Sequence, residues 1–176
     1  MATVLASSGR AAADQDDWQL AARAGISSVR VENRDPFGLG AGLDLRYGLD
    51  DAWAVRVSGS FARLTMDGDM GKMLPGGTVW SYSSFAGLDF SMDVIRLLPT
   101  FEAGLGVLGS NGTLKSHAAI GMQAGVGADY LLTPRVSIGG IAEYIYAPFD
   151  LIANVLTGNQ VPQAFSISAR VSWILR

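Results

Sequence analysis

The side chains that could carry chemistry in this sequence are mostly charged residues set singly into apolar segments. They are four arginines and five acids, namely Arg23, Asp44, Arg46, Arg56, Asp89, Glu102, Asp129, Glu143 and Arg170. Paired acids can act as general acid and base, but each acid here has an arginine candidate nearby. We therefore interpret these residues as an ion-pair network rather than as catalytic groups.

Other kinds of reactive site find little support. The chain has no cysteine and a single histidine, His117, which excludes thiol catalysis, disulfides and metal sites built from several Cys or His ligands. A nucleophilic site is conceivable with Ser116, His117 and either Glu102 or Glu143, but neighbouring residues of a strand point to opposite faces. We expect no metal, no cofactor and no enzymatic activity.

The composition describes the surroundings of these charges. The chain has 176 residues, of which 49% are hydrophobic and only 16% charged, with 22 glycines. A charged share of about 25% is usual for soluble domains. A net charge of −3 and a pI of about 5.0 exclude a nucleic-acid partner, which a basic patch would reveal. No apolar run reaches the roughly 18 residues that a membrane helix needs.

Alternation of apolar with small or polar residues recurs in eight segments, each near the length of a tilted membrane strand. The segments cover residues 18–27, 37–48, 53–62, 80–90, 100–107, 120–130, 136–146 and 164–173. Short connections follow the second, fourth and sixth segments, and longer ones follow the first, third, fifth and seventh. Since an open sheet edge cannot be left in lipid, this pattern predicts an all-β, eight-stranded, antiparallel up-and-down transmembrane β-barrel. The end with the short connections is called the turn end below, and the opposite end the loop end.

Aromatic residues on the apolar face decide which face meets lipid. A soluble barrel would hold its apolar face inside, and a small lumen has no room for these rings. Those at the turn end are Trp18, Tyr47, Trp53, Phe90, Phe101, Tyr130 and Trp173, and a second row lies at the loop end. Two aromatic belts around an aliphatic band are typical of the interfacial girdles of outer-membrane barrels.

Residues 18–173 resemble the small eight-stranded outer-membrane β-barrels of Gram-negative bacteria, similar to the outer membrane protein A, X and W families. The resemblance rests on two phrases typical of periplasmic hairpins, at residues 45–53 and 129–135, and on a last strand similar to the signal read by the barrel-assembly machinery. Some small barrels act on lipid A, but the lipid A deacylases carry a serine two residues after their histidine, where this sequence has Ala119.

The inward face predicts how the lumen is filled. An eight-stranded barrel is about filled by its own side chains, so the charges should pair and seal the turn end. The lumen toward the loops should be lined by glycine, serine and Gln123 and form a small wet vestibule. If a hydrophobic molecule enters, the inward Phe85, Leu108, Ile141 and Ile145 would line its path, as the resemblance to the W family allows.

The long loops carry an apolar set that could bind a partner or pack on itself or on the membrane. Its members are Met70, Met73, Leu74, Phe149, Leu151 and Ile152. At the other extreme of the sequence, Ala11-Ala12-Ala13 resembles a signal-peptidase site. We interpret residues 1–17 as a leader remnant or flexible tail and residues 18–176 as the barrel domain.

These observations predict an integral outer-membrane barrel with a structural or loop-mediated binding role. A narrow, porin-like channel or transporter for small or hydrophobic solutes is the alternative, and a lipid A-modifying enzyme is a more distant one. We expect extracellular long loops and periplasmic termini. The expected partners are the lipid bilayer with its lipopolysaccharide, the barrel-assembly machinery, and a protein or hydrophobic ligand at the loops.

Overall fold

The computed structural model describes residues 16–30, 35–66, 76–112, 116–150 and 161–175. They form one closed antiparallel barrel in which each strand pairs with its neighbours in sequence and β1 pairs with β8. The strands are β1 Trp18–Arg30, β2 Phe37–Gly48, β3 Trp53–Met66, β4 Gly77–Ser91, β5 Leu97–Gly112, β6 His117–Thr133, β7 Val136–Asp150 and β8 Gln163–Leu175. The predicted fold class is confirmed. No helix long and apolar enough to cross a membrane occurs in these ranges.

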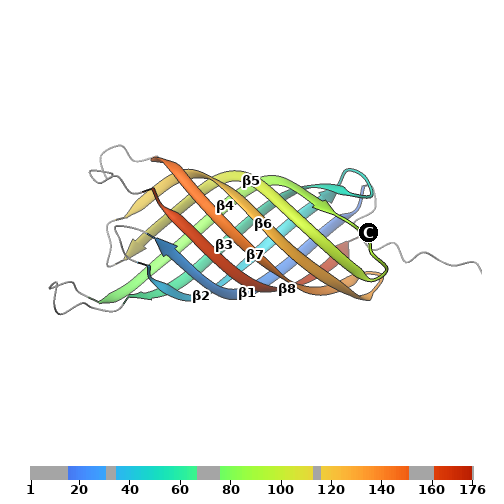
Figure 1. Ribbon diagram of the computed structural model, residues 1–176, viewed down its shortest axis with the longest axis horizontal. Helices are drawn as coiled ribbons and strands as arrows, with labels where there is room; N and C mark the ends of the chain where they lie inside the picture. The colour runs from blue at the N-terminus through green and yellow to red at the C-terminus, as the bar shows by residue number, and fades with distance from the viewer. Residues whose placement is uncertain (1–15, 31–34, 67–75, 113–115, 151–160, 176) are drawn as a thin grey trace, which may run out of the picture.

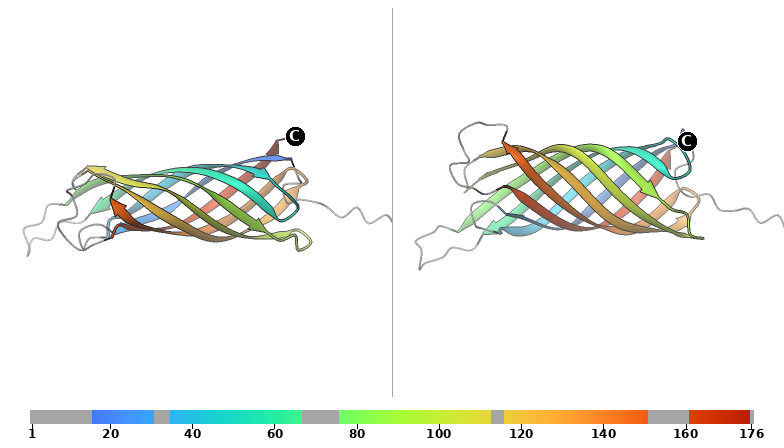
Figure 2. Two further views of the ribbon diagram at one scale, coloured as in Figure 1. Left: turned by 90° about the horizontal axis from the view of Figure 1, so that it is seen from above. Right: turned by 45° about the horizontal axis from the view of Figure 1, so that its top comes forward.

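The strands are longer than the sequence pattern predicted. They have 12 to 17 residues, and β4, β5 and β6 begin three residues before the predicted segments. The alternation of the sequence is weaker there because the inward residues Val79, Leu98 and Ala119 are apolar as well. Figures 1 and 2 show an elongated barrel with strongly tilted strands.

The tilt of the strands follows from the register. Starting at Leu20 and passing from partner to partner through all eight strands, the pairing row returns to β1 at Arg30, ten residues further on. Strand number and this stagger together set the tilt and width of a barrel. A pairing row therefore climbs from the turn end toward the loop end as it passes from β1 to β8.

Local chemistry explains the short turns. In the β2–β3 turn the carboxylate of Asp50 accepts hydrogen bonds from the backbone N–H of Ala52 and Trp53, at 2.8 and 2.7 Å. Side-chain acceptance of this kind stabilises turns. Val94 and Leu97 exchange two backbone hydrogen bonds of 3.0 Å across the β4–β5 turn. Ile95 within this turn has a φ of 65°, a conformation that β-branched residues rarely adopt.

Candidate functional site in the barrel lumen

The turn-side half of the lumen holds a charged network centred on Glu102 of β5. One carboxylate oxygen of Glu102, Oε1, lies 2.8 Å from Nη2 of Arg46 and 2.8 Å from Nη1 of Arg170. The other oxygen, Oε2, lies 2.8 Å from Nη1 of Arg56. Three strands, β2, β3 and β8, thus direct arginines at one buried carboxylate. Ion pairs of this kind are shorter and stronger than neutral hydrogen bonds.

Two aspartates extend the network around Glu102. Asp89 lies 2.7 Å from Nε of Arg46 and 3.0 Å from Nε of Arg56. Asp129 accepts hydrogen bonds from Nε and Nη2 of Arg170, at 3.1 and 2.7 Å. The two-bond geometry fixes the plane of the Arg170 guanidinium, so these residues form a rigid layer across the barrel.

Glu143 of β7 forms the edge of the network nearest the loops. Its carboxylate pairs with Arg23 and accepts hydrogen bonds from the side chains of Gln123 and Ser166. Asp44 is held less closely, with Oδ1 3.5 Å from Nε of Arg23 and 3.7 Å from Nη1 of Arg56. The structure thus brings all nine predicted residues together, and every one of them is buried.

Gln123 belongs to this network, although the sequence analysis placed it in a vestibule above. Its amide oxygen accepts a 3.1 Å hydrogen bond from Arg56, and its amide nitrogen donates to Glu143. This contact could not be predicted from the sequence, because Arg56 and Gln123 lie 67 residues apart. Their approach depends on the stagger of the whole barrel.

Inward glycines make room for the large charged side chains. A Cβ atom at Gly42 would lie 2.7 Å from Nε of Arg23, and one at Gly139 would lie 2.1 Å from Oδ1 of Asp129. Real Cβ atoms do not approach this closely. The glycine content noted in the composition therefore serves, at these two positions, to admit the network.

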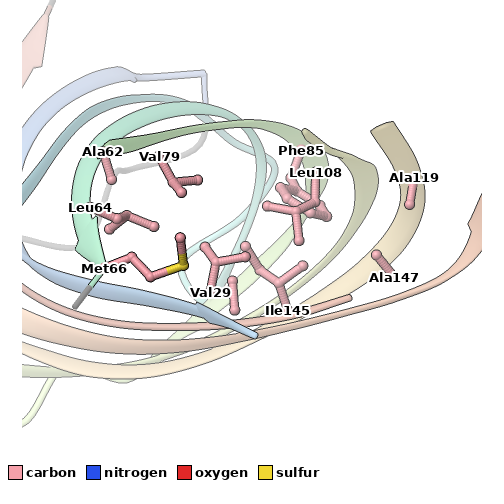
Figure 3. Close-up of a cluster of buried hydrophobic side chains, with 11 residues drawn as sticks. Val29, Ala62, Leu64, Met66, Val79, Phe85, Leu108, Ala119, Ile145 and Ala147 are labelled. Atoms are coloured by element: carbon pink, nitrogen blue, oxygen red, sulfur yellow. The ribbon is translucent and has the colours of Figure 1, made fainter. Parts of the chain in front are cut away.

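The lumen nearest the loops is apolar, so the predicted vestibule lined by glycine and serine does not extend to the loop end. Side chains from seven strands meet there in an apolar cluster, shown in Figure 3. Its members are Val29, Ala62, Leu64, Met66, Val79, Phe85, Leu108, Ala119, Ile145, Ala147 and Ala164. Phe85 and Ile145, which the sequence placed on the inward face, are buried as part of this cluster. Ile141, a third inward apolar residue, is also buried.

The space left inside is small. A cavity of about 40 Å³ lies between the charged network and the apolar cluster, with Arg23, Glu143, Leu108 and several serines among its lining. A second, of about 30 Å³, lies at the turn end beside Arg46 and Asp129. A water needs roughly 10–15 Å³ measured in this way, so each has room for only a few waters.

The aromatic residues of the predicted girdle lie on the outward face near the turn end. The rings of Trp18 and Tyr47 are 5.0 Å apart between centroids, as are those of Trp53 and Phe90. Phe101, Tyr130 and Trp173 are exposed on the same side of the wall. At the loop end Phe61 stacks on Trp80, also at 5.0 Å.

Most residues of the candidate loop patch lie outside the described part of the chain, whereas the possible catalytic acids lie within it. Met70, Met73, Leu74, Leu151 and Ile152 lie outside the described residues, as do residues 1–15 of the predicted leader or tail. Phe149 is described; it is 64% exposed and pairs with Ile120 in register. Glu102 and Glu143, the possible catalytic acids, are both engaged by arginines. Within the described part of the chain no group of three or more acidic or histidine residues could hold a metal.

A closed barrel with an outward apolar wall and a charged lumen defines the class of outer-membrane β-barrels. The sequence matches the model of the outer membrane protein beta-barrel domain over residues 1–173. The chain belongs to this family, as the sequence analysis predicted. No curated protein sequence matches it.

Solved structures share the fold at low sequence identity. Neisserial surface protein A has a TM-score of 0.65 and 17% identity, with 89% of this chain and 96% of that chain covered. OprG from Pseudomonas aeruginosa has a TM-score of 0.61 and 9% identity, with 93% and 98% covered. Ail of Yersinia pestis, solved with the heparin analogue sucrose octasulfate, has a TM-score of 0.56 and 17% identity, with 92% and 99% covered. These similarities concern the fold.

Proposed function

We propose that this protein is a structural barrel of the outer membrane that presents its long loops to a partner, and that its lumen does not conduct. The filling of the lumen is the observation that supports this function. The charged network occupies the turn-side half and the apolar cluster the loop-side half, with cavities of about 40 and 30 Å³. A hydrated ion crossing the barrel would have to displace side chains of both the charged network and the apolar cluster.

The proposed orientation places the loops outside the cell and both termini in the periplasm. Short turns on the periplasmic side and longer loops outside are typical of such barrels. In this arrangement the charged network seals the periplasmic side of the lumen. A protease site inserted at Gly71, between β3 and β4, should be cut on intact cells, whereas one inserted at Asp51, in the β2–β3 turn, should resist cleavage.

Single-channel recording in planar bilayers tests the closed lumen. The purified barrel should give no large and stable open current at neutral pH. A variant with Glu102→Ala and Phe85→Ala, which thins both layers, should give measurable openings. Steady large currents from the unmodified protein would show that the lumen conducts and would reject the proposal.

Passage of a small hydrophobic solute is the second candidate, and the apolar cluster favours it. Inside the lumen, a molecule entering from the loops would meet Phe85, Leu108 and Ile145 before the charged network. Uptake of a hydrophobic dye into vesicles with and without the barrel distinguishes this function. Uptake that falls when Leu108 is replaced by Asp would support passage of the solute. Uptake equal to that of vesicles without the barrel would reject passage and favour the structural role.

Loop-mediated binding is supported by the apolar residues in the sequence of the loops and by Phe149, which is exposed at the loop end of β7. Ail of Yersinia pestis, which shares this fold, was solved in complex with the heparin analogue sucrose octasulfate, so ligand binding has a precedent in this fold. For this chain, replacing Phe149 and Ile152 by Ser should abolish binding of an apolar partner without unfolding the barrel. A heat-modifiability gel, in which a folded barrel migrates differently when boiled, checks the folding of the variant.

We further propose that the protein has no catalytic activity and that the barrel-assembly machinery inserts it through β8. The engagement of Glu102 and Glu143 by arginines supports the first statement. Mass spectrometry of lipid A from cells with and without the protein tests it, since a modified lipid A would contradict it. Replacing Phe165 and Trp173, which lie outward on β8, with Ser should reduce insertion into the membrane.

A further inference from the structure

The outward wall of the barrel carries an apolar groove that crosses β4, β5, β6 and β7. Its volume is about 610 Å³, within the range of about 300–1,000 Å³ of sites for small ligands. Three alanines, Ala86, Ala103 and Ala124, form its floor together with the backbone of neighbouring glycines. Larger side chains border the floor, namely Leu88, Leu105, Met122, Tyr144 and Tyr146.

The register places this groove within one leaflet. Leu88, Ala103, Ala124 and Tyr144 share one pairing row, and Ala86, Leu105, Met122 and Tyr146 share the next row toward the loops. Because pairing rows climb toward the loop end, the groove rises from the middle of the apolar band to the loop-side aromatic row. It therefore faces only the leaflet on the loop side.

The shape of the groove favours a flexible chain over a second protein. Helices and barrels in lipid gain nothing from apolarity alone, so close packing selects their neighbours. A standard protein interface uses about 20–30 residues a side, whereas this groove is bordered by five large side chains around an alanine floor. The convex wall of another barrel would rest on Leu105 and Met122, which are 65% and 50% exposed, and leave the floor empty.

If the flexible chain in the groove is the acyl chain of a lipid, the head group of that lipid would lie near an outward cation. Arg63 is outward on β3, its guanidinium carbon 5.7 Å from the centroid of the Trp80 ring. No carboxylate of the described residues lies within ion-pair distance of it, whereas Arg30, the other outward arginine at the loop end, pairs with Asp35 at 2.7 Å. Arginine is well suited to bind phosphate.

The separation of the two features suits one lipid molecule. Trp80 beside Arg63 and Ala86 in the groove are six residues apart on β4, roughly 20 Å at about 3.4 Å per residue. A strand tilt of about 35–45° reduces this height to roughly one leaflet, half of the hydrocarbon core of about 30 Å.

We propose that this wall binds one lipopolysaccharide molecule of the loop-side leaflet, with a saturated acyl chain in the groove and a phosphate of its lipid A on Arg63. Outer-membrane lipopolysaccharide combines several acyl chains with phosphates on one compact head group, as the paired features require. The proposal rests on the loop-outside orientation put forward above.

Matched alanine pairs test the groove. Ala103 and Ala124 are directly paired across β5 and β6, and Ala24 and Ala169 are directly paired across β1 and β8 on the opposite wall. All four are exposed. Replacing the first pair by Leu fills the groove, while replacing the second pair by Leu adds the same bulk elsewhere. Arg63→Gln removes the cation.

Native mass spectrometry of the barrel in detergent, titrated with lipopolysaccharide or with phosphatidylethanolamine, provides the measurement. The unmodified protein should retain one lipopolysaccharide. Filling the groove should weaken its retention about tenfold or more, and Arg63→Gln about tenfold, as for loss of one charge-assisted hydrogen bond. Replacing Ala24 and Ala169 by Leu should leave the retention of lipopolysaccharide unchanged. The retention of phosphatidylethanolamine should not change on Arg63→Gln.

Several outcomes would overturn the proposal. Equal weakening by both alanine pairs would mean that the groove is not a site. Equal retention of the two lipids by the unmodified protein would mean that a phospholipid occupies it, and dimers lost on filling the groove would identify a second copy as its occupant. Orientation is tested separately by the inserted protease sites, so an inverted barrel that still retains lipopolysaccharide in detergent would contradict the proposed function and not the binding site.

Discussion

Arg170 of β8 and Glu102 of β5 meet across the lumen, with Nη1 and Oε1 2.8 Å apart, although 68 residues separate them in the sequence. The same guanidinium also binds Asp129 and the hydroxyl of Thr100, the latter at 3.2 Å. Arg170 therefore joins the last strand to the middle of the barrel. The Arg170 side chain is fully buried. If it were removed, water from the solvent could not readily take its place beside Glu102 and Asp129.

Replacing Arg170 by Met should destabilise the barrel strongly. The substitution removes a positive charge that neutralises the buried carboxylates of Glu102 and Asp129. Breaking a buried ion pair in this way costs about 3–5 kcal/mol in free energy of unfolding. Urea-induced unfolding in lipid vesicles measures it. The triple variant with Glu102→Gln and Asp129→Asn should recover part of this loss, and a triple variant no more stable than the single one would show that the charge balance is not the cause.

Phe85→Ala should destabilise the barrel through the apolar cluster. Phe85 is 2% exposed, and removing a buried phenyl ring costs about 3–5 kcal/mol. Phe61→Ala is the matched control, because Phe61 is outward and loses mainly its stacking on Trp80, worth roughly 0.5–1.5 kcal/mol. Similar losses for both variants would show that the loop-side lumen is not a packed core.

Ile95→Asn should stabilise the protein. Ile95 has a φ of 65° and is 88% exposed, so its side chain gains little from burial while its backbone is strained. Asn tolerates this conformation in two-residue hairpin turns, and relief of such strain is worth about 1 kcal/mol or more. A higher urea midpoint is expected, with Arg96→Asn in the same turn as the neutral control.

Lowering the pH should loosen the connection between β1 and β2 only in the acid range. A hydrogen bond from Arg30 lowers the pKa of the Asp35 carboxyl below its usual value. A lowered carboxyl pKa stabilises the folded state above the unfolded value, near 3.9, and this contribution is lost as the pH falls through the lower folded value. An NMR titration of Asp35 should therefore show its midpoint below 3.9, and Arg30→Gln should return it to the ordinary value.

The sequence predicted the strand order and the two faces because lipid and lumen impose opposite demands on alternate residues. Trp18 and Arg23 could be assigned to opposite faces because one is at an even and the other at an odd position of the same strand. Val29, Leu64 and Val79 lie beyond the predicted segments and were not assigned to a face; continuing the alternation past those segments was the available signal for the apolar cluster. The contact of Gln123 with Arg56 could not be derived, because it requires the ten-residue stagger that only the closure of β1 on β8 determines.

The pairing of β1 with β8 differs from every other pairing in the barrel, because it joins Trp18 to Leu175 while all other partners are successive strands. The entropy lost in closing a loop grows with its length, and pairings distant in sequence slow folding. Each hairpin can form from local chain, but the junction of the two ends needs almost the whole chain in place. We expect the rate of folding to depend on this final closure more than on any single hairpin.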